Sequence, residues 1–200
     1  MNFLLLCIAI LISLQSAWGR VIPENVVDDL RKGYSQTELQ LLDADTSFIR
    51  ELVFRGKKPP SQRKPIYLVT AGAPGARKST ILEKYLHTQP EYQGMVYVDP
   101  DQRGIRFMSG TYCAQSLNNY KISQFSNYRE AQKSAYDYWR AGSNYIANTL
   151  LNEAIAGKYD IAHGSTLTGP FSGALLKSIH AAGYRIIMIL CGAEDTVRSL

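Results

Sequence analysis

The spacing of apolar and polar residues divides the chain into helices and strands. Apolar residues recur every three or four positions from Pro23 to Arg55, and Ser35 with Glu38 has the spacing of a capping box, so this segment is predicted to be helical. Four apolar runs further along are predicted to be strands, at residues 66–70, 95–98, 159–162 and 185–190. Helical patterns alternate with them, at residues 78–87, 129–156 and 171–182.

This alternation predicts an α/β fold of three layers, with a mostly parallel sheet flanked by helices. The 200 residues suffice for one main domain. We therefore expect an N-terminal helical segment at residues 20–60 and an α/β domain at residues 61–200. Residues 104–127, which are polar, are predicted to form a loop facing a substrate. The aromatic residues of the long helix, such as Trp139, are expected to lie in the core.

Residues 1–19 allow two interpretations. An apolar run from Phe3 to Ile12 precedes Ala17-Trp18-Gly19, whose small residues resemble a signal-peptidase site, so the segment is predicted to be an export signal. Basic residues follow the run and none precede it, a pattern that favours a short membrane anchor with the remainder in the cytoplasm. The protein is thus expected to be exported or membrane-associated if the segment is a targeting signal, and otherwise cytoplasmic.

Charge and cysteine content narrow the possible partners. The net charge is +5 and the pI is about 9.1, but basic residues are scattered among acidic ones, which favours small anionic ligands over nucleic acid. The one locally basic segment, residues 55–64, contains two prolines and is predicted to be a linker. The three cysteines, Cys7, Cys113 and Cys191, lack metal-ligand spacing and do not support a disulfide framework.

The nine residues after the first core strand have the character of a phosphate-binding loop: Gly72-Ala73-Pro74-Gly75-Ala76-Arg77-Lys78-Ser79-Thr80. The pattern of such loops is glycine, four residues, glycine, lysine, and then serine or threonine. Gly72, Lys78 and Ser79 fit this pattern, whereas Arg77 occupies the position of the second glycine. The segment therefore matches at all but one required position.

Each matching residue would have a role in binding a nucleoside triphosphate. Backbone N–H groups and the positive end of the following helix would hold the phosphates, while Lys78 would bind the β- and γ-phosphates. Ser79 would bind Mg²⁺, so the predicted cofactors are ATP or GTP with Mg²⁺. Arg77 would either crowd the phosphates or add a cationic contact. The alternative is an ordinary Gly-Pro turn capped by Ser79 or Thr80.

Two other predicted strands end in polar residues. Residues 95–98 lead into Asp99-Pro100-Asp101, and residues 159–162 lead into His163, Gly164, Ser165 and Thr166. In a parallel sheet, the carboxyl ends of the strands form the ligand-binding edge beside a phosphate loop. A carboxylate there would accept the proton of an attacking hydroxyl, or hold Mg²⁺ through water, while Ser165 and Thr166 would bind an acceptor. The alternative role for Asp101 is to cap a helix.

Together these motifs resemble the zeta toxin and UDP-N-acetylglucosamine kinase family of phosphate-loop kinases. The likeness runs from about Ile66 to about Arg198, and its motifs are the phosphate loop, Val98-Asp99-Pro100-Asp101, Gly164-Ser165-Thr166-Leu167 and Gly183-Tyr184. The resemblance implies a P-loop NTPase-type fold and the phosphorylation of a sugar-nucleotide hydroxyl by ATP or GTP. It further implies that Asp101 is the general base, that Lys78 binds phosphate, and that an antitoxin protein is a partner.

The chain departs from the family pattern at three places. Arg77 replaces the loop glycine, and His163 stands where family members usually carry a glutamate, so His163 is either a substrate ligand or a packed histidine at a strand end. The family's lid arginines lie beyond Leu200 or are reduced to Arg198, so the domain at residues 61–200 is expected to be truncated at its C-terminus.

The expected activity is therefore ATP-dependent phosphorylation of a hydroxyl of a sugar nucleotide such as UDP-N-acetylglucosamine. The alternative is a catalytically impaired member that binds nucleotide or a protein partner without phosphoryl transfer. A nucleotide hydrolase of the switch type is disfavoured, because residues 185–190 do not end in an acidic metal-binding residue, although Glu194 and Asp195 are near.

Overall fold

The computed structural model describes residues 20–101, 117 and 128–192 of the chain. The predicted signal or anchor at residues 1–19 and most of the predicted loop at residues 104–127 lie outside the described residues. Cys7, Cys113, Glu194, Asp195 and Arg198 also lie outside them.

The described residues form helices and a sheet in the predicted α/β order. The elements are α2 (Glu24–Asp29), α3 (Gln36–Phe54), β1 (Ile66–Ala71), α4 (Lys78–Thr88), the 3-10 helix η1 (Pro90–Tyr92), β2 (Val96–Val98), α6 (Tyr128–Ala156), β3 (Ile161–His163), α7 (Ser172–Ala181) and β4 (Arg185–Leu190). The capping box before α3 is present, because the Ser35 side chain accepts from Glu38 N and the Glu38 side chain accepts from Ser35 N. The third strand begins two residues later than predicted and includes His163.

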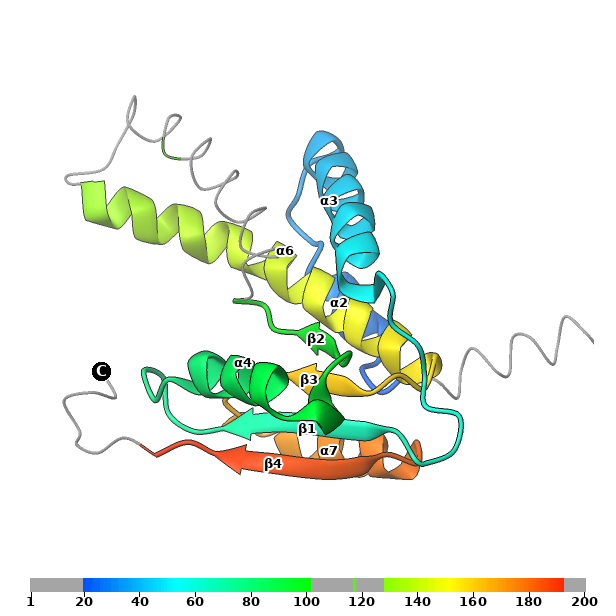
Figure 1. Ribbon diagram of the computed structural model, residues 1–200. Coiled ribbons are helices and arrows are strands. Elements are labelled where there is room, and N and C mark those ends of the chain that lie inside the picture. Colours follow the sequence, from blue (N-terminus) through cyan, green and yellow to red (C-terminus); the bar gives the residue numbers. More distant parts are fainter. Residues whose placement is uncertain (1–19, 102–116, 118–127, 193–200) are drawn as a thin grey trace, which may run out of the picture.

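The four strands form one parallel sheet in the order β2-β3-β1-β4. The register aligns Val69 with His163 and Val98 with His163, so these three strands end side by side. Helix α4 covers one face of the sheet and α7 the other, as Figure 1 shows. The three-layer α/β arrangement expected from the sequence is therefore confirmed.

Alternating strand residues supply two cores, one on each face of the sheet. Tyr67, Val69 and Ile161 point toward α6 and α7 and belong to the larger cluster, which also includes residues of α3. Leu68 and Ala162 point the other way and pack with Leu82 of α4. Because both faces are covered, the strands are almost continuously apolar.

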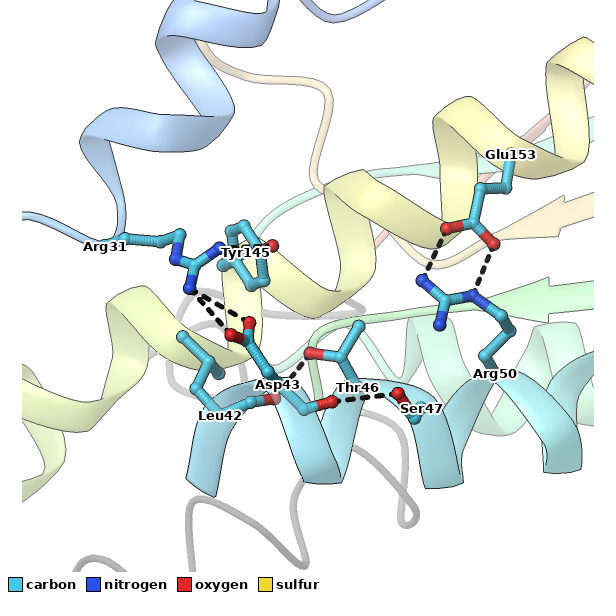
Figure 2. A network of polar contacts seen from close by, with 8 residues as sticks. All are labelled: Arg31, Leu42, Asp43, Thr46, Ser47, Arg50, Tyr145 and Glu153. Atoms are coloured by element: carbon cyan, nitrogen blue, oxygen red, sulfur yellow. Dashed lines mark hydrogen bonds and ion pairs between the residues drawn. The ribbon is translucent and has the colours of Figure 1, made fainter. Parts of the chain in front are cut away.

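The N-terminal helix α3 packs against the long helix α6 through apolar and polar contacts. Its buried residues are Leu42, Thr46, Ile49 and Val53. Arg50 donates to both carboxylate oxygens of Glu153, at 2.8 and 2.7 Å. Arg31, just after α2, donates to Asp43 at 3.0 Å and to the Tyr145 hydroxyl at 3.1 Å (Figure 2). The N-terminal segment is thus joined to the same core as the sheet.

Helices long and apolar enough to cross a membrane are not found among the described residues.

Candidate functional site

A cleft of about 580 Å³ opens at the carboxyl ends of β1, β2 and β3. Open parallel sheets flanked by helices bind their ligands outside the carboxyl ends of the strands, which is where this cleft lies. Its lining residues come from the phosphate loop, from the ends of β2 and β3, and from one flank of α6. They are Pro74, Gly75, Arg77, Lys78, Ser79, Thr80, Asp99, Pro100, Asp101, Arg140, Ala147, Asn148, His163, Gly164, Ser165 and Thr166. Most residues predicted for the site therefore face one cavity.

The phosphate loop turns between β1 and α4 through residues with positive φ. Gly72 and Gly75 have φ of 149° and 83°, and Arg77 has φ 55° and ψ 29°, in the left-handed region. Gly72 is required for packing as well, because a Cβ there would clash with the backbone of Cys191. The loop thus adopts the turn that the glycine pattern predicts, even at the position where arginine replaces glycine.

The first turn of α4 faces the cleft with its amides available. Within the described residues, no side chain caps this helix end, and its N-terminal residue is Lys78. The Lys78 ammonium donates to the carbonyl of Ala73 at 2.6 Å, across the loop itself. Arg77 is exposed and lines the cleft, whereas Ala76 is buried. Ala73 is also exposed, while Gly72 is half-buried.

Asp99, at the end of β2, is a buried carboxylate beside the loop. Its side chain is 4% exposed, and its Oδ2 accepts from the hydroxyls of Ser79 and Tyr97, both at 3.3 Å. Burial is the main cause that raises its pKa, and the nearby Asp101 raises it further, while the hydrogen bonds it accepts act in the opposite direction. Gly164 allows this packing, because a Cβ there would overlap the Asp99 carboxylate.

Asp101, the predicted general base, lies at the mouth of the cleft. Its side chain is 46% exposed and forms an ion pair with Arg140 of α6, whose side chain is 27% exposed. Its backbone N–H donates to Asp99 Oδ1 at 2.8 Å, which fixes the turn between the two carboxylates. Asp101 is therefore accessible from the cleft, whereas Asp99 contacts the loop serine.

His163 lies at the end of β3, between the cleft and the core. Its Nδ1 is hydrogen-bonded to the hydroxyl of Tyr67, and the two rings are in edge contact with centroids 5.8 Å apart. Burial lowers its pKa to about 4, so the imidazole is neutral at pH 7. His163 thus lines the cleft and is packed against β1, whereas its role as a substrate ligand stays a prediction.

The segment after β3 is held to β1 and to the phosphate loop by hydrogen bonds. Thr70 Oγ1 donates to the carbonyl of Ser165 at 3.1 Å, and Gly72 N donates to the carbonyl of Thr166, also at 3.1 Å. The Ser165 hydroxyl accepts from Leu167 N at 3.2 Å. The side chains of Ser165 and Thr166 are half-buried and line the cleft.

Sequence reasoning missed the contribution of α6 to the cleft. Arg140 and Asn148 line it, whereas the prediction for this helix concerned only its buried face and its aromatic residues. A signal was present, because Arg140, Asn144 and Asn148 form a polar stripe at four-residue spacing beside the buried face. Only the packing of α6 on β2 and β3 determines that this stripe borders the cleft.

The oxygen atoms beside the phosphate loop fit a magnesium ion held jointly with phosphate. Mg²⁺ takes one or two protein oxygens and completes its octahedron with phosphates and water. Ser79 Oγ and Asp99 Oδ2, 3.3 Å apart, supply such oxygens. Groups of three or more histidine, cysteine or carboxylate ligands do not occur among the described residues, so a cage made of protein ligands is not found in this part of the chain.

The parallel sheet, the loop after β1 and the carboxylates after β2 define a phosphate-loop protein of the α/β class. A family model for the zeta toxin matches residues 50–197, so the chain belongs to the zeta toxin family. The resemblance inferred from the motifs is thereby confirmed.

A solved structure from the PezAT chromosomal toxin–antitoxin system of Streptococcus pneumoniae is similar in fold. The TM-score is 0.55 at 20% sequence identity, and the match covers 78% of this chain and 57% of that chain. This chain thus corresponds to little more than half of the pneumococcal protein's length. No curated protein gives a significant sequence match.

Proposed function

We propose that this protein is a kinase that transfers the γ-phosphoryl group of ATP to a hydroxyl of a sugar nucleotide such as UDP-N-acetylglucosamine. The observation that carries the proposal is that one cleft is lined both by Lys78 and Ser79 of the phosphate loop and by Asp101. Groups suited to a phosphoryl donor and a carboxylate suited to an acceptor hydroxyl therefore face the same space.

The loop side of the cleft would bind the donor. The amides at the start of α4 and the glycine-bearing turn would surround the phosphates. Lys78, which donates to Ala73 O, would exchange this carbonyl for phosphate oxygens. Ser79 would hold Mg²⁺, with Asp99 in support, and the ion would neutralise charge on the phosphates.

The acceptor side would supply proton transfer and orientation. As the acceptor oxygen bonds to the γ-phosphorus, the bond from that phosphorus to the bridging oxygen of ADP breaks, and the hydroxyl proton passes to the Asp101 carboxylate. Ser165, Thr166 and His163, which line the same cleft, would contact the acceptor. Neutral His163 would act there as a hydrogen-bonding group and not as a cation.

A second candidate function is nucleotide or partner binding without phosphoryl transfer. It is favoured by Arg77, which holds a left-handed backbone conformation at the position of the loop glycine. A protein partner, an antitoxin, would suit either function, and the similar pneumococcal fold comes from a toxin–antitoxin system. Turnover distinguishes the two candidates.

The donor site is tested by titrating a fluorescent ATP analogue with Mg²⁺ into the wild type and Lys78→Ala. We expect the variant to bind at least about tenfold more weakly, because a charge-assisted contact to phosphate is lost. Lys84→Ala is the matched control, since Lys84 lies on the same helix and does not line the cleft. Equal affinity of wild type and Lys78→Ala would remove the nucleotide site.

The reaction is tested by incubating the protein with ATP, Mg²⁺ and UDP-N-acetylglucosamine and measuring phosphorylated sugar nucleotide by mass spectrometry. We expect product with the wild type and a large loss with Asp101→Asn, which retains the shape of the side chain but cannot accept the proton. ATP binding without product, in the wild type and in Arg77→Gly alike, would support the binding-only candidate.

A further inference from the structure

Among the described residues, the lining of the cleft contains more cations than carboxylates. In the part of the chain that the structure describes, the cations that line it are Arg77 and Lys78 on the phosphate loop and Arg140 on α6. Asp99 and Asp101 are the carboxylates among the lining residues, and Asp99 is buried against Ser79. The loop cations would suffice for a triphosphate with Mg²⁺, so Arg140 is left for a second anionic group.

Arg140 is held in place by neighbours of two kinds. Its Nη1 donates to Asp101 Oδ1, and its guanidinium carbon lies 5.8 Å from the centroid of the Tyr136 ring. An arginine placed over an aromatic face is oriented before it meets a ligand, so less side-chain freedom is lost on binding. Asn148, eight residues further along α6, lines the same wall and offers amide donors.

The position of Arg140 relative to Asp101 indicates which ligand it would meet. Asp101 is the group proposed to contact the acceptor hydroxyl, and Arg140 touches it directly. Lys78, by contrast, lies folded over the loop at Ala73. Arg140 is therefore on the acceptor's side of the cleft.

We propose that Arg140, assisted by Asn148, forms a second anion subsite that binds the phosphate or diphosphate of the acceptor and in doing so displaces Asp101. This inference rests on the proposed kinase function and names a property of its acceptor, which is a negative charge near the reacting hydroxyl. In this proposal the Arg140–Asp101 ion pair and the binding of the acceptor's phosphate exclude each other. Acceptor binding frees the Asp101 oxygen that the arginine occupies, and the carboxylate becomes available to receive a proton.

The exposure of the pair makes this exchange feasible. With side chains 27% and 46% exposed, the two groups keep much of their hydration, and such pairs are weak. A diphosphate offers more negative charge and more acceptor oxygens than a single carboxylate, and arginine binds it through parallel hydrogen bonds. The same exchange would exclude uncharged sugars, which cannot compete for Arg140.

The test measures the affinity of the Lys78→Ala protein for UDP by isothermal titration calorimetry. Uridine, which lacks the diphosphate, is titrated as the uncharged counterpart. The Lys78→Ala background weakens phosphate binding at the loop, so the titration reports mainly on the subsite. Arg140→Gln is expected to weaken UDP binding by at least about tenfold. Lys133→Gln, which removes another cation of α6 that does not line the cleft, is expected to leave it unchanged.

Asp101→Asn is expected to change the affinity for UDP in the direction opposite to that of Arg140→Gln. Removing the carboxylate that competes for Arg140 should tighten UDP binding several-fold and leave uridine binding unchanged. This arm retains Arg140, so it remains informative if Arg140→Gln does not fold, which circular dichroism will reveal. No UDP binding in the Lys78→Ala background, equal affinity in Arg140→Gln, or weaker or unchanged affinity in Asp101→Asn would each overturn the inference.

These outcomes are separate from those that test the kinase. Failure of the ATP analogue to bind would remove the proposed function, whereas the UDP titration would still report on Arg140. Unchanged UDP affinity in Arg140→Gln, together with Lys78-dependent ATP binding, would remove the subsite and leave the nucleotide site in place.

Discussion

Arg77 is the residue at which the phosphate loop departs from its usual composition, and its backbone is strained. At φ 55° and ψ 29° its Cβ is crowded by the backbone, at a cost of about 1–2 kcal/mol for a residue other than glycine. The loop that contains it is packed at two places, because Gly72 lies against the Cys191 backbone and Ala76 is buried. The loop geometry is therefore imposed by its surroundings.

We predict that Arg77→Gly will be more stable than Arg77→Ala by about 1 kcal/mol in urea denaturation, although both remove the guanidinium. Alanine keeps the strained Cβ, whereas glycine removes it, and the added freedom of glycine in the unfolded chain offsets only part of the gain. Comparing the two variants with each other separates backbone strain from charge. Equal stability, or a more stable alanine variant, would contradict the conformation described for this residue.

The burial of His163 predicts a dependence of stability on pH. The pKa of His163 is lowered from 6.5 to about 4 by burial, so the unfolded chain binds a proton more readily than the folded protein in that interval. The associated stability is fully present above pH 6.5 and is lost as the pH falls toward 4. In free energy of unfolding, the loss is on the order of 3 kcal/mol at most.

His163→Gln should therefore flatten the stability curve between pH 6.5 and 4, as measured by urea denaturation at several pH values. His180→Gln is the control, because His180 lies exposed in the last turn of α7 and should leave the slope of the wild type unchanged. A variant lacking His163 that keeps the full wild-type slope would show that another group titrates in this interval.

The stability that helix α3 adds to the fold depends on the apolar residues of its buried face. Leu42 is 1% exposed in the core between α3 and α6, whereas its neighbour Leu41 is 43% exposed. The polar contacts of the same helix, such as Arg50 with Glu153, join side chains that are 40% and 37% exposed and so contribute less. Apolar burial is thus the main force that holds α3 in place.

We predict that Leu42→Ala will lower the free energy of unfolding by about 2–4 kcal/mol, because it leaves a cavity in a packed core. Leu41→Ala removes the same atoms from the same helix and should cost less than about 1 kcal/mol. Chemical denaturation of the two variants measures the difference. Similar losses in both would mean that α3 does not pack on α6 through the face described.

At the scale of the whole molecule, one core joins the N-terminal helices to the sheet. The larger apolar cluster includes Ile49 of α3, Val96 of β2, Trp139 of α6 and Ile179 of α7. Trp139 also stacks on Tyr34, with ring centroids 5.1 Å apart, so the tryptophan contacts the segment before α3. Elements that share a core in this way unfold together.

We predict that unfolding followed by far-ultraviolet circular dichroism and by tryptophan fluorescence will give coincident transitions. The measurement uses Trp18→Phe, because the chain has two tryptophans and this variant leaves Trp139 as the sole source of signal. A fluorescence transition at lower denaturant than the dichroism transition would instead indicate that α3 separates from the remainder before the sheet unfolds.

Local sequence by itself determined the helices, the strands and the chemical character of the loop. The capping box at Ser35, the strand–loop–helix order around Lys78 and the carboxylates after β2 each depend on residues that are neighbours in the chain. Hydrogen bonds of caps and the periodicity of apolar residues act over a few positions, so they can be recognised in the sequence. The fold class followed from their alternation.

Only the tertiary structure decided which of these residues meet. The strand order β2-β3-β1-β4 places Asp99 against Gly164, and the packing of α6 brings Arg140 to Asp101, 39 residues away in the chain. Such contacts depend on how distant segments bury their apolar faces together. The sequence around one partner therefore does not indicate which residue the other partner is. The chain thus encodes a phosphate loop directly, whereas the wall of the cleft that Asp101 and Arg140 form exists only once the helices and the sheet have packed.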